Sequence, residues 1–286
     1  MRTPSFAAVL SLSLCGAVAS ANPLPARATA DVGPKGSYSV GVFNPFRIAV
    51  TDRLELEANP LLFFVAPHAT ARFGILRDDA PVRLTAEGGF LVPTFGMRLL
   101  KGYLFPTFAT SQNNIGWMVV PRLALLLSSG PRTGDVWTVS AEVNVRIPFQ
   151  ETNVGPLNSF LAPLDLLMAA PLTGYSARVG GAYDKRLTDM FRLRGELNIW
   201  LVGSGGTLRT DGRDVGPLAV TSPLYVTAHL GLDIAVGKSS RFTIGGYFAN
   251  YDQGATTVIK GSDGFADRVR VRSNNFLPTI DFIWAG

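Results

Sequence analysis

Alternation of apolar and polar residues constrains this chain more than any other feature. It is clearest over residues 137–147, 191–201 and 224–236. In each of these stretches every second residue is apolar or small, as in Trp-Thr-Val-Ser-Ala-Glu at the start of the first. A period of two is that of a β-strand with one apolar and one polar face. We therefore expect long strands, each half apolar.

The first 21 residues have the features of a cleavable export signal. Arg2 supplies the positive charge, an apolar run follows over residues 6–19, and residues 19–21 (Ala-Ser-Ala) fit the cleavage rule. The only cysteine, Cys15, lies in this segment and follows Leu14, which is too large for a typical lipid-attachment site. The mature chain therefore contains no disulfide and no thiolate metal site.

The rest of the chain divides into a short leader and one folded domain. Residues 22–35 are rich in alanine, proline and other small residues, so we expect a periplasmic leader without stable structure. Residues 36–286 are expected to form the barrel described below. The formal net charge of +5 is spread without a dense Lys/Arg cluster, so nucleic-acid binding is not expected.

Hydropathy points to a membrane protein without helical spans. No mature segment reaches about 18 uninterrupted apolar residues, the length of a spanning helix. Yet the mean hydropathy is +0.23 and only 16% of residues are charged, which is lean for a soluble exported protein. A transmembrane β-barrel reconciles the two, because its apolar residues occupy alternate positions.

We expect an all-β, antiparallel up-and-down barrel of about 12 strands, with ten as the alternative because the eleventh strand has the weakest pattern. The expected hairpins join residues 37–50 to 53–65, 69–77 to 81–92, 115–127 to 135–149, 174–186 to 190–202, 223–236 to 241–252, and 267–272 to 276–285. Asn44-Pro45 is taken as a bulge in the first strand, and residues 273–275 (Ser-Asn-Asn) as the last turn.

Longer connections separate these hairpins, over residues 93–114, 150–173 and 203–222. Within them, residues 97–103 could form one or two helical turns, and the apolar residues 160–170 could form an interfacial or plug element. With both termini in the periplasm, this assignment places the tight turns outside and the long connections inside, which reverses the usual rule. Either the barrel is unusual or one early strand is miscounted.

Trp and Tyr residues fall near the expected strand ends, as in the aromatic belts at the two interfaces of spanning barrels. The residues assigned to these belts are Trp117, Trp137, Trp200, Trp284, Tyr175, Tyr225 and Tyr251. The alternative is that they anchor the core of a soluble β-sandwich.

The polar faces of the strands are expected to line the lumen, because an arginine facing lipid at the midplane costs about 2–4 kcal/mol. The residues assigned to the lumen are Arg83, Glu87, Arg122, Glu142, Arg146, Arg178, Arg192, Arg194, Glu196, His229, Asp233 and Asp281. Arginines outnumber acidic residues, which predicts a mild anion preference if the barrel conducts. Replacing Arg192 and Arg194 with glutamate should then favour cations, or prevent folding if both are held in ion pairs.

The chain resembles the bacterial outer-membrane β-barrel class over nearly its whole mature length. The resemblance rests on the export signal, the alternating strands, and a final strand in which Ile280, Phe282 and Trp284 alternate with other residues. In that class the aromatic residue is terminal, whereas here Ala285-Gly286 follow it. The resemblance implies the outer membrane of a Gram-negative-type bacterium, contact with its lipid, and recognition of the last strand by the barrel-assembly machinery. It matches no functionally defined family and leaves the oligomeric state open.

Two classes of function stay open: a narrow passive channel for small solutes, and a non-conducting structural or surface-interaction barrel. A lumen wide enough for water would favour the first. A lumen closed by charged side chains, or by residues 160–170 folded inward, would favour the second.

A lipid hydrolase is the third class, because twelve-stranded outer-membrane phospholipases are similar in size. Such a site needs a histidine beside a nucleophilic serine. His68 has no serine nearby in the chain, and His229 is followed by Leu230-Gly231 rather than by a serine two residues on. We therefore expect no enzymatic activity, no metal site and no cofactor.

Overall fold

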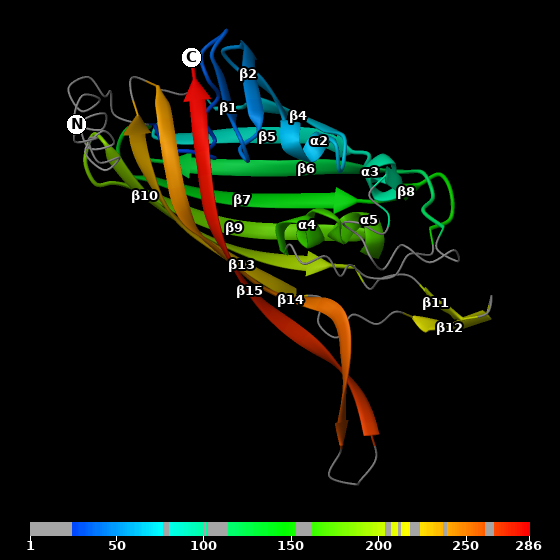
Figure 1. The fold of residues 1–286 in the computed structure, drawn as a ribbon. Helices are drawn as coiled ribbons and strands as arrows, with labels where there is room; N and C mark the ends of the chain where they lie inside the picture. Colours follow the sequence, from blue (N-terminus) through cyan, green and yellow to red (C-terminus); the bar gives the residue numbers. More distant parts are fainter. Residues whose placement is uncertain are drawn as a thin grey trace, which may run out of the picture.

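A computed structural model describes residues 25–76, 80–99, 101, 114–152, 162–203, 207–210, 213–217, 224–236, 239–260 and 266–286. Twelve strands close into an antiparallel up-and-down barrel (Figure 1). They are β1 (Tyr38–Gly41), β2 (Phe46–Thr51), β3 (Leu54–Ala58), β4 (His68–Gly74), β5 (Val82–Leu91), β6 (Met118–Ser129), β7 (Val136–Val145), β9 (Tyr175–Arg186), β10 (Phe191–Val202), β13 (Leu224–Val236), β14 (Ser240–Lys260) and β15 (Ala266–Ala285). The export signal assigned to residues 1–21 lies outside the described residues.

The remaining elements are short and lie in the connections. They are the strands β8 (Ile147–Pro148), β11 (Thr207–Thr210) and β12 (Arg213–Pro217), and the helices α2 (Pro60–Phe63), α3 (Pro93–Leu99), α4 (Ala162–Leu167) and α5 (Ala169–Thr173). Helix α2 begins where Asn59 caps it, since the Asn59 side chain accepts a hydrogen bond from the Leu62 N–H and Pro60 occupies the first turn. No helix among the described residues is long and apolar enough to cross a membrane.

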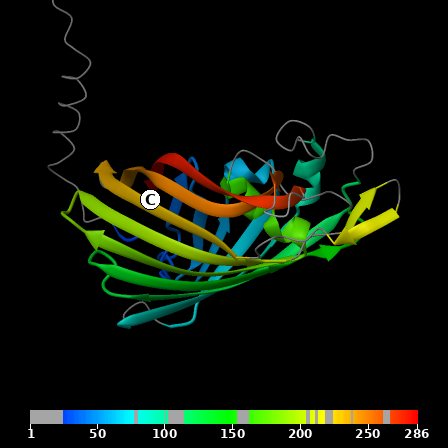
Figure 2. The ribbon, with the colours of Figure 1, turned by 90° about the horizontal axis from the view of Figure 1, so that it is seen from below.

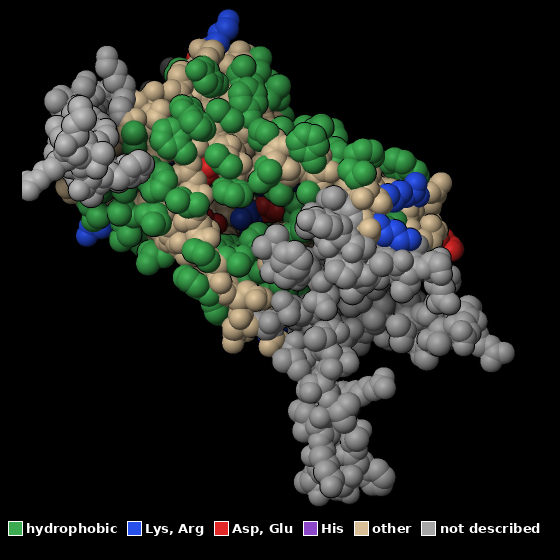
Figure 3. Space-filling view, in the orientation of Figure 1, with side chains coloured by type: hydrophobic (Ala, Val, Ile, Leu, Met, Phe, Trp, Pro, Cys, Tyr) green, Lys and Arg blue, Asp and Glu red, His purple; other side chains and the backbone are tan. Residues whose placement is uncertain are grey.

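The predicted alternation directs apolar side chains outward. Leu123, Val179 and Leu230 are 64%, 61% and 60% exposed on the outer surface, while their polar neighbours in sequence turn into the barrel. Figure 3 shows this apolar exterior over much of the visible face. An outer surface of this kind with a charged interior is the reverse of a soluble sandwich, whose apolar face is inside.

The sequence-based assignment of twelve strands holds, but two of its hairpins are wrong. Residues 37–50 form two strands, β1 and β2, because Asn44-Pro45 lies in a turn rather than in a bulge. Residues 266–285 form one strand, β15, in which Asn274 pairs with Asn250 of β14 instead of turning the chain. The first error misses one strand and the second counts one too many, so the total stays at twelve.

The early miscount also explains the reversed orientation. The C-terminal residue Gly286 exchanges backbone hydrogen bonds with Tyr38, so the end of β15 and the start of β1 lie at one end of the barrel. The tight turns that follow β2, β4, β6, β9 and β13 lie at this same end, and the longer connections lie at the other (Figure 1). With β1 and β2 counted separately, the barrel has short turns at the terminal end and long loops opposite, as is usual for outer-membrane barrels.

The tight turn after β6 depends on a glycine. Gly130 has a φ of 102°, a conformation that L-residues rarely adopt. A Cβ at this position would lie against the carbonyl oxygen of Asp135 across the turn. The turn after β6 therefore has the residue that its backbone requires.

The barrel closes at a short seam between β1 and β15. Three residue pairs join these strands, Ser39–Ala285, Val40–Trp284 and Gly41–Ile283. Beyond them a single carboxylate continues the contact: Asp281 accepts hydrogen bonds from the backbone N–H groups of Val42, Phe43, Asn44 and Phe282, at 2.8–3.2 Å, and from Asn44 Nδ2 at 2.5 Å. Asp281 thus fixes the turn between β1 and β2 to the last strand.

Replacing Asp281 with alanine should destabilise the barrel by about 2–4 kcal/mol, because several N–H groups at the seam lose their acceptor together. Unfolding by urea in lipid vesicles, followed by tryptophan fluorescence, measures this change. Asp189→Ala is the matched control, since that carboxylate is exposed and pairs only with Arg186 within its own turn; we expect less than about 1 kcal/mol there. Equal stability of the two variants would contradict the role given to Asp281.

Candidate functional site: the charged interior of the barrel

The interior of the barrel carries the charged residues that the sequence assigned to it. Inward-facing side chains with ion-pair or hydrogen-bond partners inside the barrel are Arg83, Glu87, Arg122, Glu142, Arg178, Arg192, Arg194, Glu196, His229, Asp233 and Asp281. Arg146 lies just beyond β7, where its Nη1 donates to the carbonyl oxygen of Pro171 at 3.1 Å. It therefore contacts helix α5 rather than the row of charges.

At the terminal end of the lumen, aspartates bridge pairs of arginines. Asp184 is 1% exposed and forms ion pairs with Arg192 and Arg194. Asp233 is fully buried and pairs with Arg241 at 3.0 Å and with Arg27 at 2.8 Å. Buried charges of this kind are stable only when each has a partner, because the interior solvates them poorly.

Midway along the lumen a second network crosses six strands. Arg72 of β4 pairs with Glu55 of β3 at 2.5 Å and with Glu87 of β5 at 2.7 Å. Arg122 of β6 then joins Glu87 at 3.0 Å to Glu142 of β7 at 3.1 Å. Arg178 of β9 continues the chain from Glu142 at 2.8 Å. The alternating signs hold neighbouring strands together across the interior.

Sequence reasoning missed several members of these networks. They are Arg47, Glu55, Glu57, Arg72, Asp184 and Arg241, all on inward positions of their strands. The signal was present, because Glu55 and Glu57 alternate with Leu54 and Leu56 in the same way as the assigned residues. These six are three arginines and three acids, so they leave the small excess of arginine among the assigned residues unchanged.

Residues 25–35 enter the barrel at its terminal end. Thr29, Ala30 and Val32 are 3%, 2% and 1% exposed. The Ala30 N–H donates to Ser128 Oγ at 2.8 Å, and the Ala30 carbonyl oxygen accepts from Thr85 Oγ1 at 2.6 Å. The expectation that residues 22–35 lack stable structure is therefore wrong for residues 25–35. Side chains of the barrel satisfy the backbone groups of this segment, as buried backbone requires.

Ion pairs hold the same segment in place. Asp31 pairs with Arg83 at 2.6 Å and with Arg132 at 2.8 Å, and Arg27 pairs with Asp233. The Arg27 carbonyl oxygen also accepts from Arg194 Nη1 at 2.7 Å. We call residues 25–35 the N-terminal plug.

Helices α4 and α5 lie inside the barrel toward the opposite end, between the wall of β13–β15 and the wall of β5–β7 (Figure 2). Leu164, Met168 and Leu172 are four residues apart and pack in a cluster with Met97 and Val120. A different face, formed by Ala162, Leu166 and Ala169, packs against Val202, Tyr225, Ala249 and Tyr251. Residues 162–173 are therefore buried on two sides, and we call them the helical plug.

Two polar contacts fix the helical plug. Asp165 is 3% exposed, and its Oδ2 accepts a hydrogen bond from the Tyr251 hydroxyl at 2.7 Å. Arg146 holds the other end of the plug at the Pro171 carbonyl. The element predicted over residues 160–170 thus folds inward where the structure describes it, from residue 162 onward.

A charged cavity of about 100 Å³ remains in the lumen beside Ala28 of the N-terminal plug. Its charged lining comprises Arg47, Glu57, Glu87, Arg122, Arg178, Arg194 and Glu196. This space suits a few water molecules or one small polar group.

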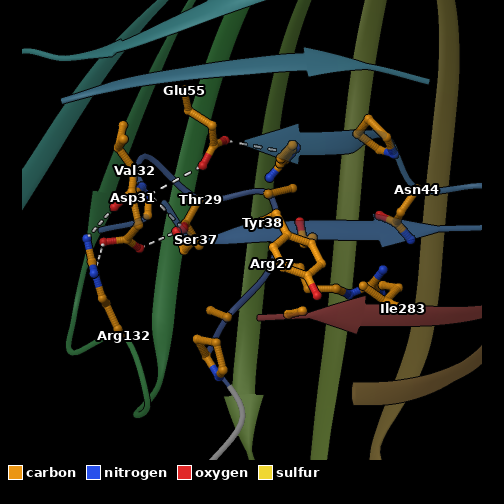
Figure 4. Close-up of a pocket in the computed structure, with 18 of the residues that line it drawn as sticks. Arg27, Thr29, Asp31, Val32, Ser37, Tyr38, Asn44, Glu55, Arg132 and Ile283 are labelled. Atoms are coloured by element: carbon orange, nitrogen blue, oxygen red, sulfur yellow. Dashed lines mark hydrogen bonds and ion pairs between the residues drawn. The ribbon is translucent and has the colours of Figure 1, made fainter. Parts of the chain in front are cut away.

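A second cavity of about 280 Å³ lies between the N-terminal plug and the seam (Figure 4). Tyr38, Asn44 and Ile283 line it on the side of the seam. Glu55 lines it too, and accepts from the Gly33 N–H of the plug at 3.3 Å. Arg47 lines both cavities.

The aromatic assignment is partly wrong. Trp117, Trp137, Trp284 and Tyr175 are outward and 41–62% exposed, as expected for a belt. Trp200, Tyr225 and Tyr251 instead face the interior: Trp200 donates to Thr227 Oγ1, and Tyr225 and Tyr251 make an edge contact with ring centres 5.9 Å apart. All three occupy inward positions of their strands. Whether an aromatic side chain faces lipid or the lumen therefore depends on its position in the alternation, and not on how close it lies to a strand end.

One outward aromatic pair lies beside the tight turn between β6 and β7. Trp137 stacks on Tyr183 with ring centres 4.2 Å apart. The Arg186 backbone N–H and the Tyr183 hydroxyl both donate to Asp135 in that turn, and they lower the pKa of its carboxyl, the backbone contact having the larger effect. The turn therefore keeps its negative charge beside the aromatic belt.

The two histidines have structural contacts. His229 Nε2 lies 3.2 Å from Thr279 Oγ1, and His68 Nε2 accepts from the Asn59 N–H at 2.9 Å. In the described part of the chain, neither histidine contacts a serine, and no group of three potential metal ligands is found.

The solved structures that are similar to this chain include two outer-membrane proteins, both at low identity. The first is outer-membrane expressed OmpT of Vibrio cholerae, with 11% identity, a TM-score of 0.44, and coverage of 85% of this chain and 64% of that one. The second is a Pseudomonas aeruginosa FadL homologue, with 10% identity, a TM-score of 0.39, and coverage of 93% and 82%. This chain thus covers less than two thirds of the length of the Vibrio protein. No protein-family model and no curated protein matches it.

The buried ion pairs change the expected outcome of the Arg192→Glu, Arg194→Glu double substitution. Because Asp184 sits between both arginines, two glutamates would place three carboxylates together at a buried site. We expect the double variant to fail to fold, with loss of heat-modifiable gel mobility after refolding into vesicles.

Adding Asp184→Arg should restore part of the folded fraction, because it restores opposite charges. Arg186→Glu, at an exposed turn, is the control and should fold normally. A folded double variant would show that these arginines are not held as the structure places them.

Proposed function

We propose that this protein is an integral outer-membrane barrel that is closed at rest, and that it acts as a structural or surface-interaction barrel rather than as a standing pore. The observation that carries the proposal is the occupation of both ends of the lumen, by the N-terminal plug and by the helical plug. The apolar exterior, the charged interior and the placement of turns and loops support location in an outer membrane.

The long-loop end supports a role at the cell surface. Strands β14 and β15 continue beyond the other strands as a paired hairpin, over residues 256–260 and 266–270, and β11 pairs with β12 in another connection (Figure 1). With the termini in the periplasm, both hairpins face outward, where they could meet other molecules. We propose outer-membrane lipid and the assembly machinery as the partners of the barrel wall, and no enzymatic activity.

A channel that opens when the helical plug moves is the second candidate. The charged cavity favours it, because it would form part of a polar path once the plug has left. The arginines are closely matched by acids, so any anion preference should be mild and should weaken at high salt.

Planar-bilayer recording tests the proposal. We expect purified full-length protein to show no steady conductance, and a variant lacking residues 162–170 to conduct, because the deletion removes the apolar packing that fills the lumen. Tyr251→Phe is a milder variant that removes the hydroxyl donating to Asp165, and it should add brief openings. Val139→Ala, on the outward face, is the control and should stay closed.

The recording also separates the two candidates. Openings of the full-length protein that respond to voltage or to a solute would favour the gated channel. A steady open current from the full-length protein would falsify the proposal that the barrel is closed at rest.

A further inference from the structure

The wall of the barrel is open beside the seam. Strands β1, β2, β3 and β4 have only 4, 6, 5 and 7 residues, whereas a membrane-spanning strand needs about 9–11. On its side toward β1, the last strand β15 has no paired strand among the described residues before Ile283. An opening therefore lies between β15 and the short strands β2 and β3.

The sequence of β15 fits an unpaired edge. The Gly286 N–H donates to the Tyr38 carbonyl oxygen, and the Gly286 carbonyl oxygen accepts from the Tyr38 N–H. Because backbone direction alternates along a strand, even-numbered residues of β15 direct their backbone groups toward this side. The backbone N–H of Phe282 faces this side without a partner strand, and it donates to the side chain of its own neighbour, Asp281. Pro278 has no N–H at all, and proline is tolerated where a strand edge stays unpaired.

The opening has an apolar rim and a charged floor. Figure 3 shows a hollow in this face with charged side chains at its base and hydrophobic ones around it. On either side of the opening the exposed apolar residues are Val42, Phe43, Phe46, Phe276 and Ile280, at 37–71% exposure. Behind the rim, the side chains of Arg47 and Glu57 keep 24% and 16% exposure.

Arg47 has unused hydrogen-bonding capacity. It lines both cavities and forms an ion pair with Glu57, its Nε lying 2.9 Å from that carboxylate, but this buried Nε has no well-aligned acceptor among the described residues. Arg178 lines the charged cavity too, and its buried Nε has no acceptor in the described part of the chain. Guanidinium groups with free donors in a confined site suit anionic oxygens such as those of phosphate or carboxylate.

We propose that the opening binds a single-chain amphiphile with an anionic, oxygen-rich head group, taken from the membrane. The head group contacts Arg47 and, behind it, Arg178, and the chain lies along the apolar rim in the lipid. The polar atoms of the head group would also lie beside the unpaired edge of β15. Without them this edge would face hydrocarbon, and unpaired backbone groups are not tolerated there. The inference rests on the membrane location proposed above, and not on whether the lumen conducts.

Binding to purified full-length barrel in maltoside micelles tests the head group and the chain separately. The probes are dodecyl phosphate, inorganic phosphate and a neutral dodecyl ether. We expect saturable binding of dodecyl phosphate alone, and about tenfold weaker binding in Arg47→Gln, because charge-assisted hydrogen bonds are lost. Arg186→Gln, an exposed arginine at a tight turn, should bind as wild type does. Equal binding of inorganic phosphate or of the neutral ether, or an unchanged Arg47→Gln, would overturn the proposal.

Photo-crosslinking locates the chain and does not depend on any variant folding. Dodecyl phosphate with a diazirine at mid-chain should label rim residues such as Phe43 and Phe276 in the wild-type protein, identified by mass spectrometry. Labels spread evenly over the outer face of β6, β7 and β9 would overturn the site. If Arg47→Gln does not fold, Arg47→Lys replaces it, with weaker binding expected because lysine lacks the planar fork.

Recording the same preparation in bilayers keeps the two proposals distinguishable. A conducting barrel that still labels at the rim would contradict closure at rest and support the wall site. A non-conducting barrel that is labelled evenly over its outer face would support closure at rest and contradict the wall site.

Discussion

The requirement that every inward arginine find an acid organises this barrel. The alternation that gives the strands an apolar outer face also turns their arginines into the lumen, where an unpaired charge is costly. Arg122 meets this requirement by bridging Glu87 and Glu142, and Arg72 by bridging Glu55 and Glu87. Each bridge joins different strands, so the ion pairs also set which side chains fill the interior. A lumen built this way is crowded before any plug enters it.

The N-terminal plug follows from the same requirement. Asp31 supplies the carboxylate for Arg83 and Arg132, and Arg27 supplies a second cation for Asp233. The plug therefore completes a set of charges that the strands leave unbalanced at this end. The helical plug has a different chemistry, since apolar packing of Leu164, Leu166 and Met168 dominates and Asp165 is its one buried charge. Salt should weaken the first plug more than the second, because screening acts on charges and not on apolar contacts.

Much of the fold could be predicted because the period of two is a property of the sequence itself. The barrel strands β6, β7, β9, β10 and β13 lie where the alternation places them. The errors arose where local signals compete with pairing. The sequence predicts a bulge at Asn44-Pro45, because strands of 4 and 6 residues are too short to show a period. It predicts a turn at residues 273–275, yet Asn274 Oδ1 accepts from Asn250 Nδ2 across the ladder at 2.6 Å. From the sequence alone, an asparagine that forms a turn cannot be distinguished from one that pairs with a residue on the neighbouring strand.

The interior contacts were harder to predict, because they join residues far apart in the chain. Residues 25–35 show no period, and their structure comes from partners such as Ser128 and Thr85 that no local pattern connects to them. Among these long-range features, the seam between β1 and β15 has the clearest signal in the sequence. Pro278 marks an edge that cannot pair, and Asp281, three residues later, caps the point where pairing resumes. The short strands that β15 would have to meet beyond Gly41 offer no ladder partner, so the barrel closes over only a few residues. The opening in the wall therefore results both from the sequence of β15 and from the short length of strands β1 to β4.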